Sequence, residues 1–417
     1  MIRTNRVSAA ALGLLLAAAA CENDELNRPF SATPVDPLFA RYVSMGNSIT
    51  AGFQSGGIND STQNQAYPRL LAQAMRSPFF VPLLSRPGCP PPYTNVFTQT
   101  RLTPTGFPPS TSTSCYLRSI PAVPPPYVSN TAVPGARVSD VYTNATPSAN
   151  NLTQFILGGL TQIGMARKAQ PTFVSLWIGN NDVLGAATNS TNGGDSTLIT
   201  PVATFETEYE AALDSIENVG TEGAVLIGVA NVTAIPYFSA GATYFAIKAG
   251  AVPGVTFPAL FTVSTNCAPI SSGIPGARGD SVLVPFPYGA ALIGAAQAGA
   301  ARNLDCADTV PQIVVPAELR KLVTTVTAYN AFISGEATAR GWAYLDPNPS
   351  LDSLRTAPGG TAVRAFPLLG QPCTANPFGT AFSCDAVHPS AATHRLIATK
   401  LRLAINAAYS TAIPPIP

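Results

Sequence analysis

The amino-acid sequence predicts an α/β protein in which a parallel sheet of about five strands is sandwiched between helices. Short apolar runs typical of strands alternate along the chain with longer runs whose apolar residues recur at helical spacing. Two of the runs, TFVSLWI and AVLIGVA, are apolar almost throughout, as expected of strands buried on both faces of a parallel sheet. The chain has 417 residues, of which 46% are hydrophobic, so it can bury a large core.

The expected strands and helices follow one another in order. We expect strands at 40–45, 79–85, 172–182, 224–232 and 342–346, and Pro82 weakens the second of them. We expect helices at about 65–75, 151–170, 205–220, 318–341 and 388–409. Pro389 stands near the start of the last helix, where proline is tolerated. Strand and helix in alternation imply parallel strands joined by helical crossovers.

Two stretches rich in proline interrupt this pattern, at about 86–130 and 237–316. Forty prolines are too many for an α/β core, so most of them must lie in loops. We read both stretches as insertions into one domain that spans 37–417.

The N-terminus predicts export. Arg3 and Arg6 precede an apolar run at 9–20, which is too short to span a bilayer and is followed by Cys21. This segment resembles a bacterial lipoprotein signal, although Ala18 stands where leucine is usual. The resemblance implies a signal peptide at 1–20, a lipidated Cys21 and a polar tether at 21–36. It also implies an outer-membrane lipoprotein of the cell envelope, held on the membrane without a spanning helix. The alternative is an ordinary signal peptide with an incidental cysteine.

Six further cysteines remain, and an even number in an exported chain favours disulfides. Fifteen pairings are possible. We expect nearest-neighbour pairs because each pair brackets a loop-like stretch: Cys89–Cys115, Cys267–Cys306 and Cys373–Cys384.

Composition excludes several classes of function. Charged residues make up only 11% of the chain and the net charge is +1, so no basic face for nucleic acid is expected. Two histidines and the absence of CxxC spacing argue against a metal site, and we expect no metal or other cofactor.

Polar residues follow the expected strands at one edge of the sheet, where ligands bind in open parallel sheets. Ser48 follows the first strand, Asn181 stands at the end of the third, and Asp385 and His388 stand at the entrance of the last helix. A serine hydroxyl needs an adjacent base, and the spacing of Asp385 and His388 lets the carboxylate orient the imidazole. Backbone amides at Ser48 and Gly135, and the side-chain amide of Asn181, could hold a developing oxyanion.

Simpler interpretations exist for single residues. Gly135 by itself would be a turn residue, and His388 could cap a helix. His394 lies inside the expected last helix, so we interpret it as a packing or surface residue.

Together these segments resemble the SGNH (GDSL-type) hydrolases. GNSIT at 46–50, Gly135 in AVPGARVSD, GNND at 179–182 and DAVH at 385–388 have the order of that family's four blocks. The resemblance covers about 39–408 and implies a flavodoxin-like three-layer α/β/α sandwich. It also implies that Ser48 is the nucleophile, His388 the base and Asp385 its partner, with Ser48, Gly135 and Asn181 in the oxyanion hole. Asn47 departs from the family, which usually has aspartate there.

The sequence therefore predicts a serine hydrolase that cleaves carboxylic esters through an acyl-enzyme on Ser48. Lipid esters, short-chain acyl esters and acetylated glycan esters all remain open as substrates. The segment FPALFTV at 257–263 could line an acyl groove or simply pack against the body. The alternative function is a surface lipoprotein that keeps the fold and binds glycans or lipids without turnover. We make no prediction of protein partners.

Overall fold

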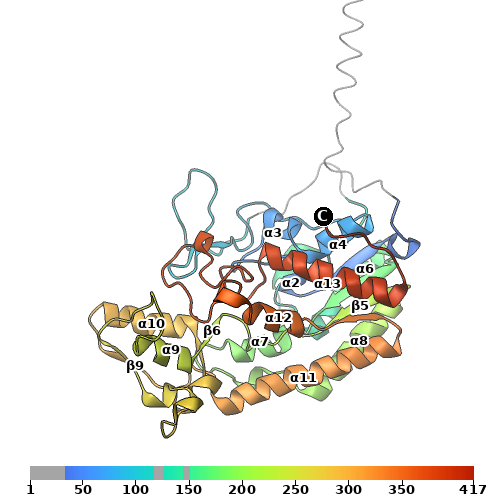
Figure 1. The fold of residues 1–417 in the computed structure, drawn as a ribbon. Coiled ribbons are helices and arrows are strands. Elements are labelled where there is room, and N and C mark those ends of the chain that lie inside the picture. Colours follow the sequence, from blue (N-terminus) through green and yellow to red (C-terminus); the bar gives the residue numbers. More distant parts are fainter. Residues whose placement is uncertain (1–32, 117–124, 144–150) are drawn as a thin grey trace, which may run out of the picture.

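A parallel four-stranded sheet forms the centre of the molecule (Figure 1). The computed structural model describes residues 33–116, 125–143 and 151–417, so the expected signal peptide and Cys21 lie outside the described residues. The strands, in spatial order, are β1 (Tyr42–Gly46), β4 (Phe173–Trp177), β5 (Gly223–Ile227) and β10 (Ala343–Leu345). All three pairings are parallel, with Ser44 opposite Ser175 and Ser175 opposite Val225.

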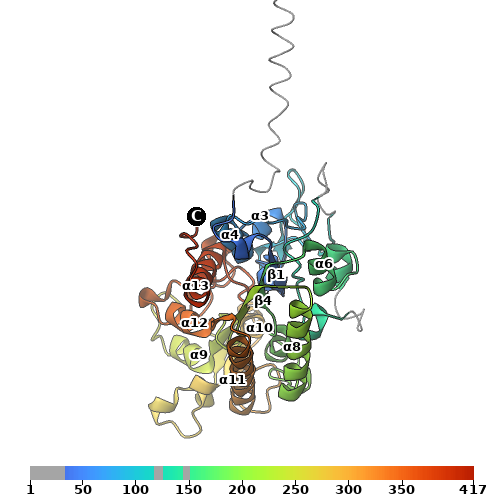
Figure 2. The same ribbon diagram turned by 90° about the vertical axis from the view of Figure 1, so that its right-hand side faces the viewer.

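Helices cover both faces of this sheet, which gives the expected three-layer α/β architecture (Figure 2). One face packs against α6 (Gln162–Ala169), α8 (Val202–Glu217) and α11 (Pro316–Ala339), and the other against α4 (Tyr67–Met75) and α13 (Ala391–Tyr409). Successive side chains of a strand point to opposite faces, so Val43 joins the first cluster and Tyr42 the second. Strands buried on both sides explain the continuous apolar runs of the sequence.

The sheet has four strands where about five were expected, because residues 79–85 form no strand. Pro82 has no N–H to donate to a ladder. The edge of β1 is instead covered by an extended segment at 129–133. Ser44 N–H donates to Ser129 C=O at 2.8 Å, and Val133 N–H donates to Gly46 C=O at 3.1 Å. This segment leads the chain directly to the carboxyl end of β1.

The shorter helices lie between these elements: α2 (Ser48–Ala51), α3 (Asp60–Asn64), α5 (Asn151–Leu157), α7 (Asn181–Ala187) and α12 (Asn348–Arg355). The single helix expected at 151–170 is divided into α5 and α6, because Gly158 and Gly159 adopt positive φ angles of 64° and 84°. The last helix begins at Ala391, after Ser390 caps it. None of the helices within the described residues has the length and apolar content needed to cross a bilayer.

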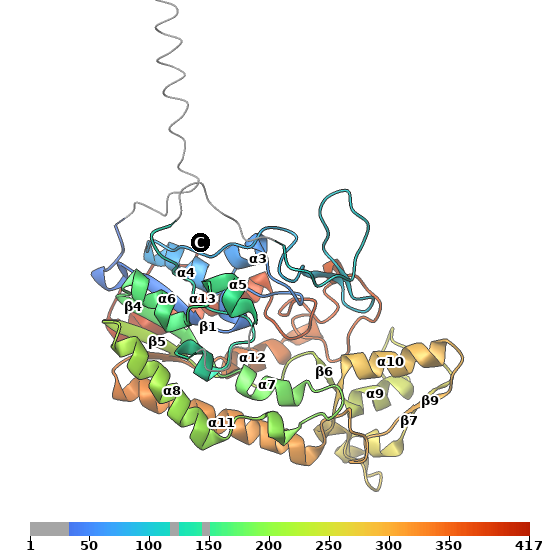
Figure 3. The same ribbon diagram turned by 180° about the vertical axis from the view of Figure 1, so that it is seen from behind.

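Residues 238–315 form a small α/β layer beside the sheet (Figure 3). Its strands pair as β6 (Phe238–Ala240) with β8 (Leu283–Pro285), and as β7 (Phe261–Val263) with β9 (Arg302–Leu304). Its helices are α9 (Gly241–Lys248) and α10 (Phe286–Gln297). Phe257, Phe261 and Val263 of FPALFTV pack in this layer's own apolar cluster, whereas Leu260 is exposed. The segment lines neither of the two cavities described below.

The segment before it carries a short antiparallel hairpin, β2 (Tyr93–Asn95) and β3 (Thr100–Arg101). All three expected disulfides are present: Cys89–Cys115, Cys267–Cys306 and Cys373–Cys384. The first holds the chain that leads into the hairpin, the second lies in the core of the small layer, and the third closes a loop that ends next to Asp385.

Candidate active site

Ser48 is the first residue of α2, immediately after the end of β1. Gly46 makes the sharp turn possible: its φ is +150°, and a Cβ there would lie 2.3 Å from the carbonyl oxygen of Trp177. Asn47 caps α2, because its Oδ1 accepts from the N–H of Ile49 at 3.0 Å. The cap needs only an oxygen acceptor, so asparagine supplies what an aspartate would. Its Nδ2 also donates to Asn180 Oδ1 at 3.4 Å.

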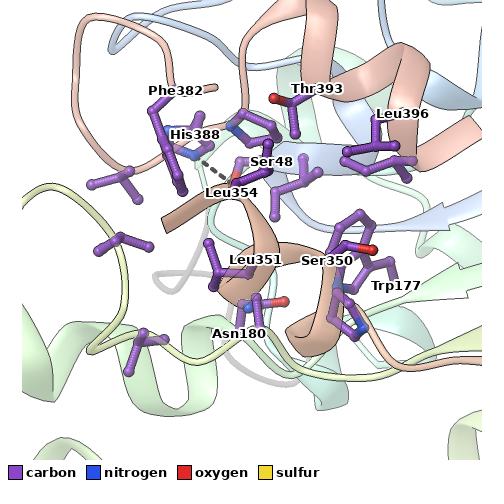
Figure 4. A pocket seen from close by; sticks show the side chains of 18 of the residues that line it. Ser48, Trp177, Asn180, Ser350, Leu351, Leu354, Phe382, His388, Thr393 and Leu396 are labelled. Carbon is purple, nitrogen blue, oxygen red and sulfur yellow. Dashed lines mark hydrogen bonds between the residues drawn. The ribbon is translucent and has the colours of Figure 1, made fainter. Parts of the chain in front are cut away.

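His388 reaches Ser48 from the loop before α13 (Figure 4). Its Nε2 lies 2.8 Å from Ser48 Oγ, and its Nδ1 lies 2.8 Å from Asp385 Oδ2. Since Nδ1–H donates to the carboxylate, Nε2 is the acceptor for the serine proton. The loop is held in a tight turn, in which Ser383 N–H donates to His388 C=O and Ala386 has a φ of +64°. The structure thus brings together the three residues that the sequence predicted would meet.

Asp385 is held by five hydrogen bonds. Its Oδ1 accepts from Ser383 Oγ–H, Val387 N–H and His388 N–H, and its Oδ2 accepts from Gly56 N–H and from His388 Nδ1–H. Burial alone would raise the pKa of this carboxyl. The charge of His388 and the hydrogen bonds outweigh burial and lower the pKa to about 2. Asp385 is therefore an anion throughout the neutral range and can stabilise an imidazolium.

His394, the other histidine, has a structural position. It is fully buried against α4, and its Nδ1 accepts from Tyr67 N–H at 3.3 Å. Burial, with a smaller contribution from His388, lowers its pKa to about 3, so its ring is neutral.

Two of the three expected oxyanion donors lie at the cavity that holds Ser48, and the third is not in its lining. Ser48 N–H makes no hydrogen bond within the described part of the chain. Asn181 begins α7 and lines the same cavity as Ser48, and its Nδ2 donates one proton to Ala136 C=O at 2.7 Å, which leaves the second proton available. Gly135 lies two residues after the segment that covers β1, is exposed, and is not part of the lining of that cavity. The structure therefore brings Asn181 to the serine, and the role of Gly135 stays a prediction.

Sequence reasoning missed two residues of this region. Asn180 lines the cavity beside Asn181 and is only 7% exposed, although the motif GNND gave equal reason to consider it. Asp182 is fully buried, with Oδ1 accepting from Thr200 Oγ–H and Oδ2 from Val138 N–H. Burial raises the pKa of Asp182 to about 7. Asp182 thus joins the start of α7 to the segment that follows Gly135.

Two cavities meet at His388. The narrow cavity, of about 100 Å³, lies between α12 and α13 and is almost entirely apolar, with Leu351, Leu354 and Leu396 in its lining (Figure 4). The wide cavity, of about 840 Å³, lies on the side of His388 that faces β2 and α10. Within the described residues no group of three or more histidine, cysteine or acidic side chains could hold a metal ion.

Comparison with known proteins agrees with the sequence motifs. The family described as GDSL-like Lipase/Acylhydrolase matches residues 42–252, a stretch that holds Ser48, Gly135 and Asn181 and ends before Asp385. No curated protein matches the chain.

Solved structures resemble the chain only distantly. A catalytic mutant of Axe2, an acetylxylan esterase from Geobacillus stearothermophilus, has 11% identity and a TM-score of 0.37, with 87% of this chain and 93% of that chain covered. LAE5, an alpha/beta hydrolase enzyme from the metagenome of Lake Arreo, has 12% identity and a TM-score of 0.37, with 90% and 99% covered. A putative GDSL-like lipase from Parabacteroides merdae has 10% identity and a TM-score of 0.37, with 90% and 99% covered.

Proposed function

The chain belongs to the GDSL-like lipase/acylhydrolase family, and we propose that it hydrolyses carboxylic esters through an acyl-enzyme on Ser48. The observation that carries the proposal is the hydrogen-bonded chain from Ser48 Oγ to His388 Nε2 and from His388 Nδ1 to Asp385, with both distances 2.8 Å. A base within hydrogen-bond reach of a hydroxyl, itself oriented by a third group, is the arrangement that activates a serine nucleophile.

In the acylation step, His388 Nε2 takes the Ser48 proton as Oγ attacks the ester carbonyl. Asp385 stabilises the imidazolium that forms, and it needs no proton itself because its pKa is about 2. The negative oxygen of the tetrahedral intermediate accepts hydrogen bonds from Ser48 N–H and Asn181 Nδ2. His388 then gives its proton to the alcohol oxygen, the carbon–oxygen bond breaks, and the acyl group remains on Ser48.

Deacylation repeats these roles with water. His388 takes a proton from a water molecule that attacks the acyl-enzyme, and returns it to Ser48 Oγ as the acid leaves. The side chains of this site supply every proton transfer.

The test compares Ser48→Ala with Ser215→Ala, a serine on α8 whose Oγ–H donates only to a carbonyl of its own helix. Ser48→Ala should lose p-nitrophenyl butyrate hydrolysis by about 10⁴-fold or more and should no longer react with a fluorophosphonate probe. Ser215→Ala should keep both. Labelling that persists in Ser48→Ala, or wild-type protein without any esterase activity, would refute the proposal and favour a binding protein.

We also propose that the chain is exported and anchored in the cell envelope by lipid on Cys21. Three disulfides suit an oxidising compartment. Mass spectrometry of the mature N-terminus, with Cys21→Ser as the comparison, tests this. A mature protein that begins elsewhere, or an unmodified Cys21, would contradict it.

A further inference from the structure

His388 is in the lining of both cavities. Resting on the hydrolysis proposed at Ser48, we infer that the narrow cavity takes a short apolar acyl chain and that the wide cavity takes a bulky uncharged alcohol, a sugar. The substrate class is therefore an ester of a sugar hydroxyl with a short fatty acid.

The positions of the reacting groups decide which cavity holds the acyl chain of the ester and which holds the alcohol. Ser48, Asn181 and His388 all line the narrow cavity, whereas the wide cavity is lined by His388 and Asp385 but by neither Ser48 nor Asn181. The acyl carbon must bond to Ser48 Oγ while its oxygen meets Asn181, so the acyl chain extends into the narrow cavity. The alcohol oxygen must take a proton from His388, so the alcohol departs on the imidazole side.

The narrow cavity limits the length of the acyl chain. Thr393, Leu396 and Lys400 line it at helical spacing along α13, opposite Leu351 and Leu354 of α12. Its volume of about 100 Å³ is below the roughly 150 Å³ of a cavity that admits benzene, so it suits a linear chain of roughly four to six carbons. Its lining has almost no polar surface, which favours an alkyl chain over an acetyl group because more apolar area is buried.

The wide cavity is lined mostly by apolar and aromatic side chains together with two glutamines, which suits an uncharged ligand with both ring faces and hydroxyl groups. It has no lysine, arginine or glutamate among the described residues, and its one carboxylate, Asp385, is occupied by His388. Tyr93 and Tyr237 contribute aromatic rings. Gln99 and Gln297 are exposed there, and neither side-chain amide makes a hydrogen bond within the described chain. Amides can bond hydroxyl groups while aromatic rings cover the apolar face of a sugar ring.

Segments from distant parts of the chain build this cavity. Figure 1 shows the hairpin of β2 and β3, the loop between α12 and α13, and α10 at the same end of the molecule, and Figure 3 shows the same grouping from behind. The hairpin and α10 come from the proline-rich insertions, so the insertions contribute much of the lining beside Asp385 and His388.

Gly294 provides the sharpest test of the wide cavity. It lies on α10, lines the cavity, and a Cβ built there meets no atom within 4 Å, so a side chain can be added at this position, and we expect the indole of Gly294→Trp to occupy part of the cavity. Gly335 on α11 is also exposed and also open around its Cβ, but it lines neither cavity, so Gly335→Trp is the matched control.

The contribution of the alcohol is measured with two substrates that share the butyryl group and differ in the alcohol, 6-O-butyrylglucose and methyl butyrate. Wild type should have at least a tenfold higher kcat/KM on the sugar ester. Gly294→Trp should lower kcat/KM on the sugar ester about tenfold, mainly through KM, and change the methyl ester less than twofold, while Gly335→Trp should change neither. Equal effects of Gly294→Trp on both esters, or a wild-type preference for monobutyrylglycerol over the sugar ester, would overturn the sugar assignment.

A p-nitrophenyl ester series from acetate to decanoate tests the narrow cavity. Wild type should prefer butyrate or hexanoate, and Leu354→Ala should move the optimum to longer chains because it lengthens the cavity. An optimum at acetate, or an optimum that does not move, would overturn the acyl assignment. Failure of the proposed function is distinguishable, because wild type would then hydrolyse none of these esters or Ser48→Ala would still hydrolyse them.

Discussion

Replacing Asp385 with asparagine tests the role of the carboxylate most directly. The two carboxylate oxygens have different tasks: Oδ1 accepts from Ser383, Val387 and the backbone of His388, and Oδ2 accepts from Gly56 N–H and His388 Nδ1–H. An asparagine side chain can be placed in two orientations, and it keeps more of these hydrogen bonds when its carbonyl oxygen takes the place of Oδ1, which accepts three of the five. Its NH₂ group then occupies the place of Oδ2.

This orientation reverses the hydrogen bond to the imidazole. The NH₂ group donates to His388 Nδ1, so the ring proton moves to Nε2, and Nε2 can no longer accept the Ser48 proton. In a serine triad this tautomer change lowers kcat by about 10⁴-fold. Gly56 N–H, which is partly buried, also loses its acceptor, and this costs less than the roughly 1–3 kcal/mol of a fully buried unsatisfied donor. The variant should therefore fold, with lower stability and very little activity.

The assay is kcat with p-nitrophenyl butyrate near pH 8, together with a urea unfolding curve. Asp214→Asn is the matched control, because Asp214 is exposed on α8, forms an ion pair with Arg340 and lines neither cavity. We expect Asp214→Asn to retain wild-type kcat. If Asp385→Asn folds and loses less than tenfold in kcat, the tautomer argument is wrong.

Four further predictions follow from the same contacts. Asn181→Ala should lower kcat by about 10²–10³-fold with little change in the unfolding midpoint, and an unchanged kcat would remove it from the oxyanion site. Gly46→Ala should destabilise the fold by more than about 2 kcal/mol in urea unfolding, because the new Cβ would lie 2.3 Å from a carbonyl oxygen of β4; a loss under about 1 kcal/mol would contradict this. Replacing Cys373 and Cys384 with serine should cost about 2–3 kcal/mol, since the bond closes a loop of 11 residues, and a negligible loss would show that the loop is ordered without it. Asp385 has a pKa of about 2 in the folded protein, below its unfolded value, so its charged form stabilises the fold above about pH 4. The free energy of unfolding of wild type relative to Asp385→Asn, measured in urea, should therefore fall by about 2 kcal/mol between pH 5 and pH 2. If the two proteins lose stability in parallel over this range, the assignment is wrong.

Much of the local structure could be predicted because it depends on neighbouring residues. The apolar runs identified β1, β4 and β5, and the helical spacing of apolar residues identified α4, α8 and α11. The pairing of cysteines followed from loops that each pair encloses. Strand 79–85 was predicted wrongly, because proximity to β1 and not local pattern selected residues 129–133 for the edge.

In the candidate site, too, some features could be predicted from the sequence and others depend on contacts between distant segments. Ser48, Asp385 and His388 were identified from their chemistry and their places at strand and helix ends, and the structure places them within hydrogen-bond distance. The donation from Gly56 to Asp385 had no sequence signal, because 329 residues separate the two. The position of Asn180 in the cavity had only a weak sequence signal, its place in the motif GNND.

The sequence by itself determined the alternation of strands and helices and the identity of the groups that could react, and it favoured the disulfide pairs that the structure confirms among fifteen possible pairings. Only the tertiary structure decided the number of strands in the sheet, the five hydrogen bonds on Asp385 and the two cavities of about 100 and 840 Å³. The physical reason is range. Periodicity and turn chemistry act between residues a few positions apart, whereas a cavity is the space that packing leaves between segments such as β2, α10 and α12, and no one of these segments encodes it.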